Sequence, residues 1–348
     1  MRDFAAFEPM DMRAVDTIPD GPEWQYEPKW DGFRAIVHRD GARVQIVSKH
    51  GQPLERYFPE VVAALRALHA DHFSLDGELV VAAAGALSFD ALQQRIHPAA
   101  SRVALLADRT PALMLVFDLL RLDDALLVDR PLRERRPLLE SFAAAFPAHA
   151  TLRLSPATTE RAIVDAWFAR VGGALDGVIA KRTNLPYAGG RRDAAVKIKK
   201  MRTADCVIGG YRLAAGTSDR IGSLLLGLYD DAGLLNSIGF CSSFRADERV
   251  TLLRDFSALA NGSGFTGTAP GATPSRWSRD AKRDRSYVAV QPVRVLEVAF
   301  DQVTAGRIRH GTRALRWRTD KDPARCTLDQ LTIADSVMPL LDPEPAAS

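Results

Sequence analysis

The residues most capable of chemistry lie between positions 27 and 34, which read Glu-Pro-Lys-Trp-Asp-Gly-Phe-Arg. Lys29 stands near a carboxylate, Asp31, and a glycine, Gly32, directly ahead of an apolar segment. We interpret this as a lysine on a tight turn, whose amine can attack a phosphoryl group once it has lost its proton. The pattern K-x-D-G is short, so an ordinary solvated lysine at a hairpin entrance is the alternative interpretation.

Six further segments with charged or aromatic residues follow in order. They are Ser48-Lys49-His50-Gly51, Leu75-Asp76-Gly77-Glu78, Val116-Phe117-Asp118, Asp176 to Lys181, Val196 to Lys200 and Arg316 to Lys321. A lysine with the reference pKa of about 10.4 is almost fully protonated at neutral pH, so the site must hold cations or a metal that disfavour the ammonium form. Such cations would also neutralise phosphate charge, and the candidates are Lys181, Lys197 and Lys199. The segment 196–199 could instead be an amphipathic strand with an exposed charged face.

In this order and at these separations, the seven segments resemble the motifs of the covalent nucleotidyltransferases, specifically the ATP-dependent DNA ligases. The resemblance runs from about residue 14 to residue 322 and is strongest toward the stand-alone bacterial C-type enzymes. The bacterial D-type enzymes share this core but attach polymerase and phosphoesterase modules, which we do not expect here. The resemblance implies ATP as cofactor, Mg²⁺ or Mn²⁺, a covalent lysyl-AMP intermediate, nicked double-stranded DNA as substrate and a role in DNA repair.

The resemblance also implies roles for individual residues of the first half. Lys29 would take AMP as a phosphoramidate, Glu27 would contact the adenine amino group, and Phe117 would stack on the adenine ring. Arg34 and Lys49 would lie near the ribose and the phosphates.

Metal and phosphate contacts are implied in the same way. Glu78 would bind the ribose hydroxyls or orient a metal, and Asp176 would hold the divalent ion. The cations implied around the nucleotide phosphates are Lys181, Lys197 and Lys199, the last two at the α-phosphate. The residues implied to orient the pyrophosphate leaving group, once the second domain closes over the first, are Arg318, Asp320 and Lys321.

Two positions depart from the commonest pattern of this family. Lys49 stands where arginine is usual and lacks the planar fork that grips phosphate with two hydrogen bonds. Asp176 stands where glutamate is usual, so its carboxylate lies one methylene nearer the backbone. Simpler interpretations also remain, since Phe117 could be ordinary core, and Glu78 and Asp176, each beside a glycine, could belong to turns.

Composition indicates an ordinary globular chain of 348 residues, of which 47% are hydrophobic and 26% charged, and this length favours two domains. No apolar run is as long as a membrane span, and the first residues lack the layout of a signal peptide, so we expect a cytoplasmic protein associated with the nucleoid through DNA. Its widely spaced cysteines predict free thiols. Neither His50 nor His310 lies in a metal-ligand pattern, so both are interpreted as structural or DNA-facing.

Net charge is only +3, but the basic residues are clustered. Residues 191–202 hold six Lys/Arg against one Asp, and residues 305–321 also hold six against one Asp. A third cluster, between residues 276 and 285, lies in a stretch rich in Gly, Pro and Ser. Such clusters suit a polyanionic partner, although any one of them could be a solvated face. We expect a monomer without membrane contacts, whose further partners would be DNA end-binding or repair proteins.

The elements that must position these residues follow from apolar patterning. Residues 33–39 and 43–48 predict a hairpin around Asp40-Gly41. Further strands are predicted at 73–82, 112–120, 177–181 and 195–199. Helices are predicted from residue 59, from a cap at Ser88 through residue 96, and near 132–146 and 158–171. Hairpins mixed with separated helices indicate an α+β class, with antiparallel sheets and flanking helices.

After residue 201 the pattern changes to one helix among strands. Strands at 206–213, 222–229, 234–240 and 293–300 with a helix at 248–259 suit a five-stranded barrel, for which the resemblance implies an OB fold. The predicted domains are an adenylation (nucleotidyltransferase) domain at 1–202, an OB-fold β-barrel domain at 203–341 and a disordered tail at 342–348.

Two alternatives for the function stay open at this point. A GTP-dependent RNA capping guanylyltransferase or an RNA ligase would share the lysine motif and its chemistry. A non-catalytic nucleic-acid-binding module belongs to another class, and the intact set of Lys29, Glu78, Lys197 and Lys199 argues against it.

Overall fold

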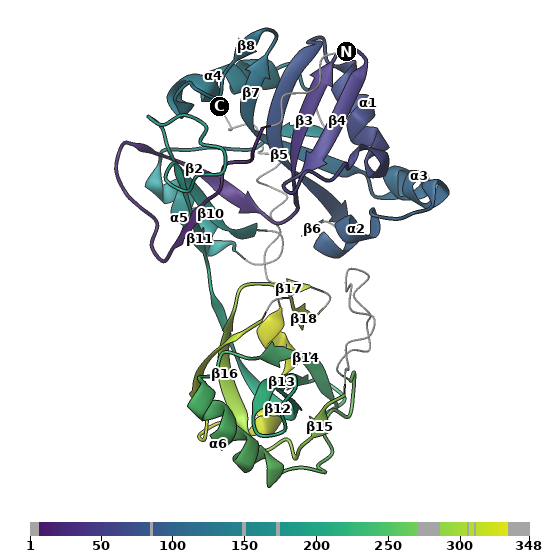
Figure 1. Cartoon of the computed structure of the whole chain (residues 1–348), viewed down its shortest axis with the longest axis vertical. Helices are drawn as coiled ribbons and strands as arrows, with labels where there is room; N and C mark the ends of the chain where they lie inside the picture. The colour runs from purple at the N-terminus through teal and green to yellow at the C-terminus, as the bar shows by residue number, and fades with distance from the viewer. Residues whose placement is uncertain are drawn as a thin grey trace. The chain divides into compact units, whose positions relative to one another are not determined.

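The computed structural model describes residues 7–83, 86–147, 151–171, 175–269, 286–304, 306–309 and 311–332. The chain divides into two compact units, with the boundary after Lys200 (Figure 1). The predicted tail, the third basic cluster and His310 lie outside the described residues. Within those residues, no helix is long and apolar enough to cross a bilayer. The prediction of free thiols is confirmed, since all three cysteines are unpaired and buried: Cys206, Cys241 and Cys326.

The first unit is built on a seven-stranded sheet. Its strands are antiparallel neighbours except for one parallel pair, β7 with β9. In spatial order they are β4 (Arg43–Ser48), β3 (Phe33–Asp40), β5 (His72–Ala83), β7 (Ala112–Leu122) and β8 (Ala125–Leu126), with β6 (Ala86–Leu87) on β5 and β9 (Leu152–Leu154) on β7. The predicted hairpin at residues 33–48 is therefore confirmed, because β3 and β4 pair directly.

A second, four-stranded sheet completes this unit. The order is β1 (Arg13–Val15), β11 (Ala195–Lys199), β10 (Leu175–Arg182) and β2 (Trp24–Trp30). Helix α5 (Arg161–Ala169) lies beside β10 and β11 in Figure 1 and buries Val164 and Trp167 in a core shared with Tyr26 and Val178. Apolar burial of this kind fixes the sheet that carries the first motif.

Four other α-helices flank the large sheet or its connections. Helix α1 begins at the predicted proline and buries Val61 and Leu65. The predicted cap at Ser88 is confirmed, because its hydroxyl accepts a hydrogen bond from Ala91 N at 3.2 Å. These helices and the short 3₁₀ turn before them are η1 (Glu55–Tyr57), α1 (Pro59–Ala67), α2 (Phe89–Gln94), α3 (Ala100–Arg109) and α4 (Leu132–Ala143).

The predicted turn at Lys29 is wrong by two residues. Lys29 is the penultimate residue of β2 and pairs with Gly177 of β10, and the turn is formed by the following Asp31 and Gly32. A Cβ at Gly32 would overlap Leu79 O and lie 2.9 Å from Glu78 Cγ. Glycine is required here because the turn packs directly on β5.

The second unit is a curled antiparallel sheet. The strand path is β14 (Leu235–Cys241), β13 (Ile221–Tyr229), β12 (Arg202–Leu213), β16 (Val295–Phe300) and β19 (Arg313–Trp317), with β15 (Val288–Ala289) on β12. A bridge between Cys241 and Thr312 joins the two ends of the path, so the sheet curls into the predicted OB-type barrel. Strand β19 was not predicted.

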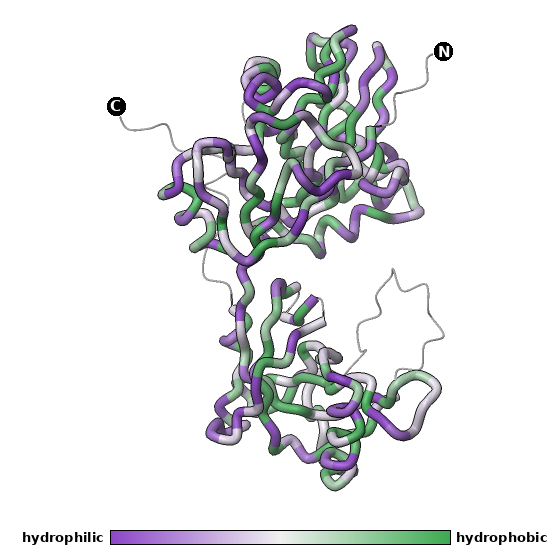
Figure 2. Tube along the Cα trace, turned by 60° about the vertical axis from the view of Figure 1, so that its left-hand side comes forward, coloured by the Kyte–Doolittle hydropathy of each residue, from purple (hydrophilic) through white to green (hydrophobic). Residues whose placement is uncertain are grey.

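The barrel interior is apolar, and Figure 2 shows hydrophobic segments running along the strands within this unit. Helix α6 (Ala246–Ser257) covers one part of the barrel with Leu252 and Phe256. The remaining short elements are β17 (Val303–Thr304), β18 (Arg307–Ile308), η2 (Pro323–Arg325) and η3 (Leu328–Leu331).

Candidate active site

Two lysines meet one carboxylate on the four-stranded sheet. The register places Lys29 of β2 and Lys199 of β11 on either side of Gly177 of β10, so the two lysines lie on the same face of the two strands that flank β10. Lys29 Nζ donates to Asp176 Oδ2, and Lys199 Nζ lies 3.2 Å from the same oxygen. Lys29 is 20% exposed and Asp176 only 5%, so the amine reaches solvent while its partner does not.

A β-bulge turns Asp176 toward these lysines. The pairing of β10 with β2 shifts register between Leu175 and Gly177, which makes Asp176 an extra residue of the strand. Bulges of this kind re-aim a side chain. Gly177 has φ +148°, and a Cβ there would overlap Ile198 O, so the bulge requires glycine. Asp176 therefore lies at a bulge within strand β10, and the alternative interpretation of Asp176 as a turn residue is wrong.

Asp176 has an unused acceptor suited to a hard cation. Its Oδ1 is buried and has no hydrogen-bond partner, and such groups in native structures usually have a ligand or water to satisfy them. Carboxylate oxygens are preferred by Mg²⁺ and Mn²⁺, and Mg²⁺ is commonly held by one or two carboxylates plus substrate phosphates. In the described part of the chain, no cluster of three or more His, Cys, Asp or Glu side chains could hold a metal. The chemistry of Asp176 therefore suits a metal that is shared with a phosphate ligand.

Glu78 lies on β5, directly across from Arg34 of β3. Loss of hydration raises the pKa of Glu78 to about 8, although the charges of Lys29 and Arg34 lower it. Burial also lowers the pKa of Lys197, and the charge of Lys29 is the next largest cause. The charge of Lys29 thus acts on both Glu78 and Lys197.

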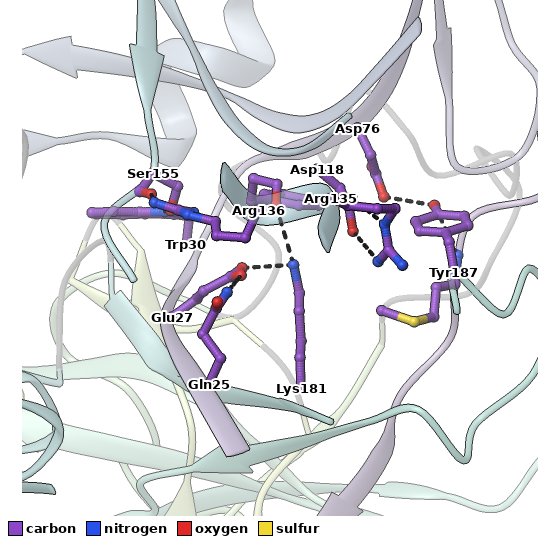
Figure 3. A network of polar contacts seen from close by, with 12 residues as sticks. Gln25, Glu27, Trp30, Asp76, Asp118, Arg135, Arg136, Ser155, Lys181 and Tyr187 are labelled. Atoms are coloured by element: carbon purple, nitrogen blue, oxygen red, sulfur yellow. Dashed lines mark hydrogen bonds and ion pairs between the residues drawn. The ribbon is translucent and has the colours of Figure 1, made fainter. Parts of the chain in front are cut away.

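Arg34 is held by a buried network that the sequence did not predict. Its Nε and Nη2 donate to the two oxygens of Asp76 at 3.1 and 2.6 Å, and its Nη1 donates to Met10 O at 2.6 Å. The hydroxyl of Tyr187 donates to the same carboxylate at 2.7 Å (Figure 3). Asp76 is fully buried, so this fork leaves Arg34 in one orientation.

Phe117 is bordered by two cations. Its ring centroid lies 4.7 Å from Lys181 Nζ and 5.6 Å from the guanidinium carbon of Arg34. Lys181 pairs with Glu27 at 2.7 Å, and Gln25 donates to the other Glu27 oxygen at 3.0 Å (Figure 3). Phe117 is half-buried rather than a closed core residue, so part of its ring is open to a stacking partner.

Several partners were missed although they lie inside or beside the motifs. Asp76 and Asp118 interrupt apolar strands, and a charge in such a run is the signal that could have identified them. Asp118 accepts both arms of Arg135 at 2.9 Å, with each side chain 2% exposed (Figure 3). A buried, two-armed pair of this kind fixes the strand that carries Phe117.

Lys49 follows β4 and contacts a carboxylate near the start of the described chain. Its Nζ lies 2.9 Å from Asp11 Oδ1, and the other Asp11 oxygen accepts from Arg192 Nε at 3.0 Å. The hydrogen bond from Lys49 is the largest cause that lowers the pKa of Asp11, to about 2. The structure therefore groups Lys49 with Arg192 rather than directly with Lys29.

The remaining predicted residues lie together in the second unit. Arg318 donates from Nε and Nη2 to Asp320 at 2.9 Å and from Nη1 to Asp205 at 2.9 Å. Lys321 Nζ lies 3.7 Å from Asp205. Asp205 was not predicted, because nothing near it in the sequence indicates that it meets residues more than a hundred positions away.

Comparison with known proteins gives two matches to family models. The model described as ATP dependent DNA ligase domain matches residues 11–199, and that described as ATP dependent DNA ligase C terminal region matches residues 217–321. Together these matches cover most of the chain and both units.

Individual relatives agree with the family models. The chain is 44% identical to DNA ligase C of Mycobacterium tuberculosis over 337 residues, which is 93% of each chain. It is 33% identical to the multifunctional non-homologous end joining protein LigD of Mycobacterium bovis over 307 residues, 87% of this chain and 37% of that protein. A solved Lig E DNA ligase shares the fold at a TM-score of 0.52 and 17% identity, over 88% of this chain and 99% of that one.

Proposed function

Because the chain belongs to the ATP-dependent DNA ligases, we propose that it seals nicks in duplex DNA through lysyl-AMP formed on Lys29. The observation that supports Lys29 most directly is its contact with the Asp176 carboxylate beside Lys199, in a sheet where the amine remains accessible. We assign the first unit to adenylation and the second to the OB-fold domain. The alternative functions in RNA capping, RNA ligation and non-catalytic binding are not favoured by the relatives.

Lys29 carries the first step of the proposed reaction. An amine is nucleophilic only without its proton, so Lys29 would lose that proton to solvent and separate from Asp176 before it attacks. Nζ then forms a bond to the α-phosphorus of ATP as the bond to the pyrophosphate oxygen breaks. Lys199, which shares the Asp176 carboxylate with Lys29, and Lys197 would neutralise charge on the α-phosphate.

Asp176 and Glu78 are the side chains that would hold a divalent ion, with Mg²⁺ as our assignment. Such an ion supplies positive charge to the phosphate oxygens. The unpartnered Oδ1 of Asp176 supports this role.

The nucleoside would bind against residues that are already fixed. Phe117 offers a partly open ring, and Glu27, held by Lys181 and Gln25, offers carboxylate oxygens to an exocyclic amine. Arg34 is oriented by Asp76 for the ribose and phosphates. An adenine amino group can donate to this carboxylate, and the match to the ATP dependent DNA ligase domain supports ATP over GTP.

The later steps use the same centre. An oxygen of the 5′-phosphate at the nick would attack the phosphorus of lysyl-AMP, breaking the N–P bond and returning the amine of Lys29. The 3′-hydroxyl would then attack the adenylated 5′-phosphate, expel AMP and lose its proton as the phosphodiester forms. We further propose that the protein acts in DNA repair, because a relative named for end joining shares this core. We also propose that it works as a monomer.

One experiment tests this proposal. The purified protein is incubated with α-labelled ATP or GTP, then chased with nicked duplex DNA or nicked RNA. We expect acid-labile protein labelling with ATP, loss of the label on addition of nicked DNA, and a sealed strand. Labelling by GTP alone, or transfer only to RNA, would contradict the assignment.

A further inference from the structure

Asp205 lies beside two cations of the second unit. It lies on β12, and its carboxylate oxygens are both 2.9 Å from Arg318 Nη1 and the nearer is 3.7 Å from Lys321 Nζ. Asp205 is 12% exposed, Arg318 18% and Lys321 30%. The two residues implied at the pyrophosphate therefore share one partly buried carboxylate.

The position of Asp205 in the sheet is unfavourable without those cations. It pairs across β12 and β16 with Glu297, which places two carboxylates directly opposite each other. Like charges in that arrangement destabilise a sheet. Here the nearest cation to Glu297 is Arg316 at 2.6 Å and the nearest to Asp205 is Arg318 at 2.9 Å, while Arg318 Nη1 also lies 4.0 Å from Glu297.

The backbone of Asp205 is fixed independently of its side chain. Strand β13 pairs with β12 only from Val207 onward, so this part of β12 has a free edge. Gln330 fills it, because its Oε1 accepts from Asp205 N at 2.9 Å and its Nε2 donates to Asp205 O at 3.2 Å. The backbone from which the Asp205 carboxylate projects is therefore held in one position.

The guanidinium of Arg318 has two different edges. Nη1 is held by the partly buried Asp205, whereas Nε and Nη2 both donate at 2.9 Å to Asp320, which is 66% exposed. An exposed carboxylate gains little from such pairing and can be replaced. A phosphate presents the same two-oxygen geometry to this fork.

We propose that Asp205 is a positioning residue for self-adenylation, holding Arg318 by Nη1 so that its Nε and Nη2 edge is presented to the pyrophosphate. This inference rests on the proposed function. Asp205 itself touches no nucleotide. It determines the direction of Arg318 and keeps Lys321 within its field, so its effect is confined to the step in which pyrophosphate departs.

The test compares Asp205→Asn with Asp205→Glu and with Glu297→Gln. Asparagine keeps the shape and the Gln330 contacts to the backbone. Glu297 is the matched control, since it lies opposite on the same sheet but pairs with Arg316 and is 4.0 Å from Arg318. Each full-length variant is measured for thermal unfolding, for single-turnover lysyl-AMP formation over a range of ATP concentrations, and for sealing of a nick that already carries AMP.

We expect Asp205→Asn to slow lysyl-AMP formation by about tenfold to a hundredfold, as misdirected groups do, and to raise the KM for ATP. Sealing of the pre-adenylated nick and the unfolding midpoint should stay near those of the wild type. Asp205→Glu should recover part of the loss, and Glu297→Gln should change both steps little.

Two results would overturn the inference while leaving the proposed function intact: unchanged lysyl-AMP formation in Asp205→Asn, or equal loss in both steps. Equal effects of Asp205→Asn and Glu297→Gln would also contradict it, because the sheet charge rather than Arg318 would then be the cause. A wild-type protein that forms no lysyl-AMP would overturn the proposed function and this inference together.

Discussion

The cations of the first unit and those of the second are held in different ways. Arg34 and Lys181 are fixed by Asp76 and Glu27, carboxylates that are at most 3% exposed. Arg318 in the second unit shares its donors between Asp205 at 12% and Asp320 at 66% exposure. The cations that we propose for the nucleoside are therefore rigidly held, and those that we propose for the leaving group are able to exchange partners.

This difference agrees with what each group has to do. A base and ribose bind similarly in every adenylated state, so a fixed pocket serves them throughout. A pyrophosphate must be gripped and then released, and loosely held cations allow that.

The largest effect is expected at the nucleophile. Lys29→Ala should abolish covalent labelling by ATP while preserving the fold, because no other amine occupies its position on β2. Lys200→Ala is the matched control, since its Nζ donates to the backbone oxygens Phe168 O and Ala169 O. Acid-labile labelling that persists in Lys29→Ala would show that the nucleophile is another residue.

Salt should weaken DNA binding strongly, but less than the number of basic residues suggests. Of the six plus six cations in the two clusters, those without a carboxylate partner in the described residues are Lys197, Lys200, Arg202, Arg307 and Arg313. Neutralising about five phosphates predicts a loss of roughly a few hundredfold in affinity for nicked duplex between about 50 and 200 mM salt.

Fluorescence anisotropy with a nicked hairpin measures that dependence. A nearly flat dependence of the affinity on salt would show that the two clusters do not contact DNA. A much steeper one would show that cations leave their carboxylates for DNA, and the contrast between fixed and exchangeable cations would then extend beyond Arg318.

Removing the buried carboxylate that holds a cation should lower the free energy of unfolding. Asp76→Asn leaves the buried Arg34 without its ionic partner, and loss of one partner of a buried pair costs about 3 kcal/mol or more. Asp71→Asn is the control, because that carboxylate pairs with Arg39 but is 60% exposed, and we expect less than about 1 kcal/mol. Thermal unfolding of both variants measures the difference, and similar midpoints would refute the rigid-pocket description.

An exchangeable cation should affect one step only. Lys321→Ala should slow self-adenylation by about tenfold or more, because charge on a leaving group is stabilised only where that group departs. Sealing of a pre-adenylated nick should be spared. Arg325→Ala, nearby and exposed, is the control. Equal loss in both assays would mean that Lys321 contacts DNA or supports the fold.

Sequence patterning predicted the elements whose signals are local. The hairpin at residues 33–48 and the strand at 195–199 follow from apolar residues and a two-residue turn, which need no distant partner. Strand β2 was missed because Pro28 and two charged neighbours, Glu27 and Lys29, are poor strand formers, and pairing with β10 overrides that preference. Helix α3 was missed because its only buried residue is Val103.

The partners of the site residues could not be predicted in the same way. Lys29 and Asp176 are 147 positions apart, and Arg318 and Asp205 are 113 apart. Such pairs depend on strand register and on the bulge at Asp176, which tertiary packing determines. The motifs therefore located the cations and some of the carboxylates, such as Asp176, while the pairing between them emerged only from the fold.

The segment ahead of β1 has a consequence for protein engineering. Met10 O accepts from Arg34, and Asp11 holds both Lys49 and Arg192. This segment connects three parts of the first unit, those that carry Arg34, Lys49 and Arg192, so deleting it would remove contacts that hold the site residues in place. A deletion that reaches residue 11 would release two cations at once, and a shortened variant designed to ease crystallisation would carry a functional defect far from the edited end of the gene.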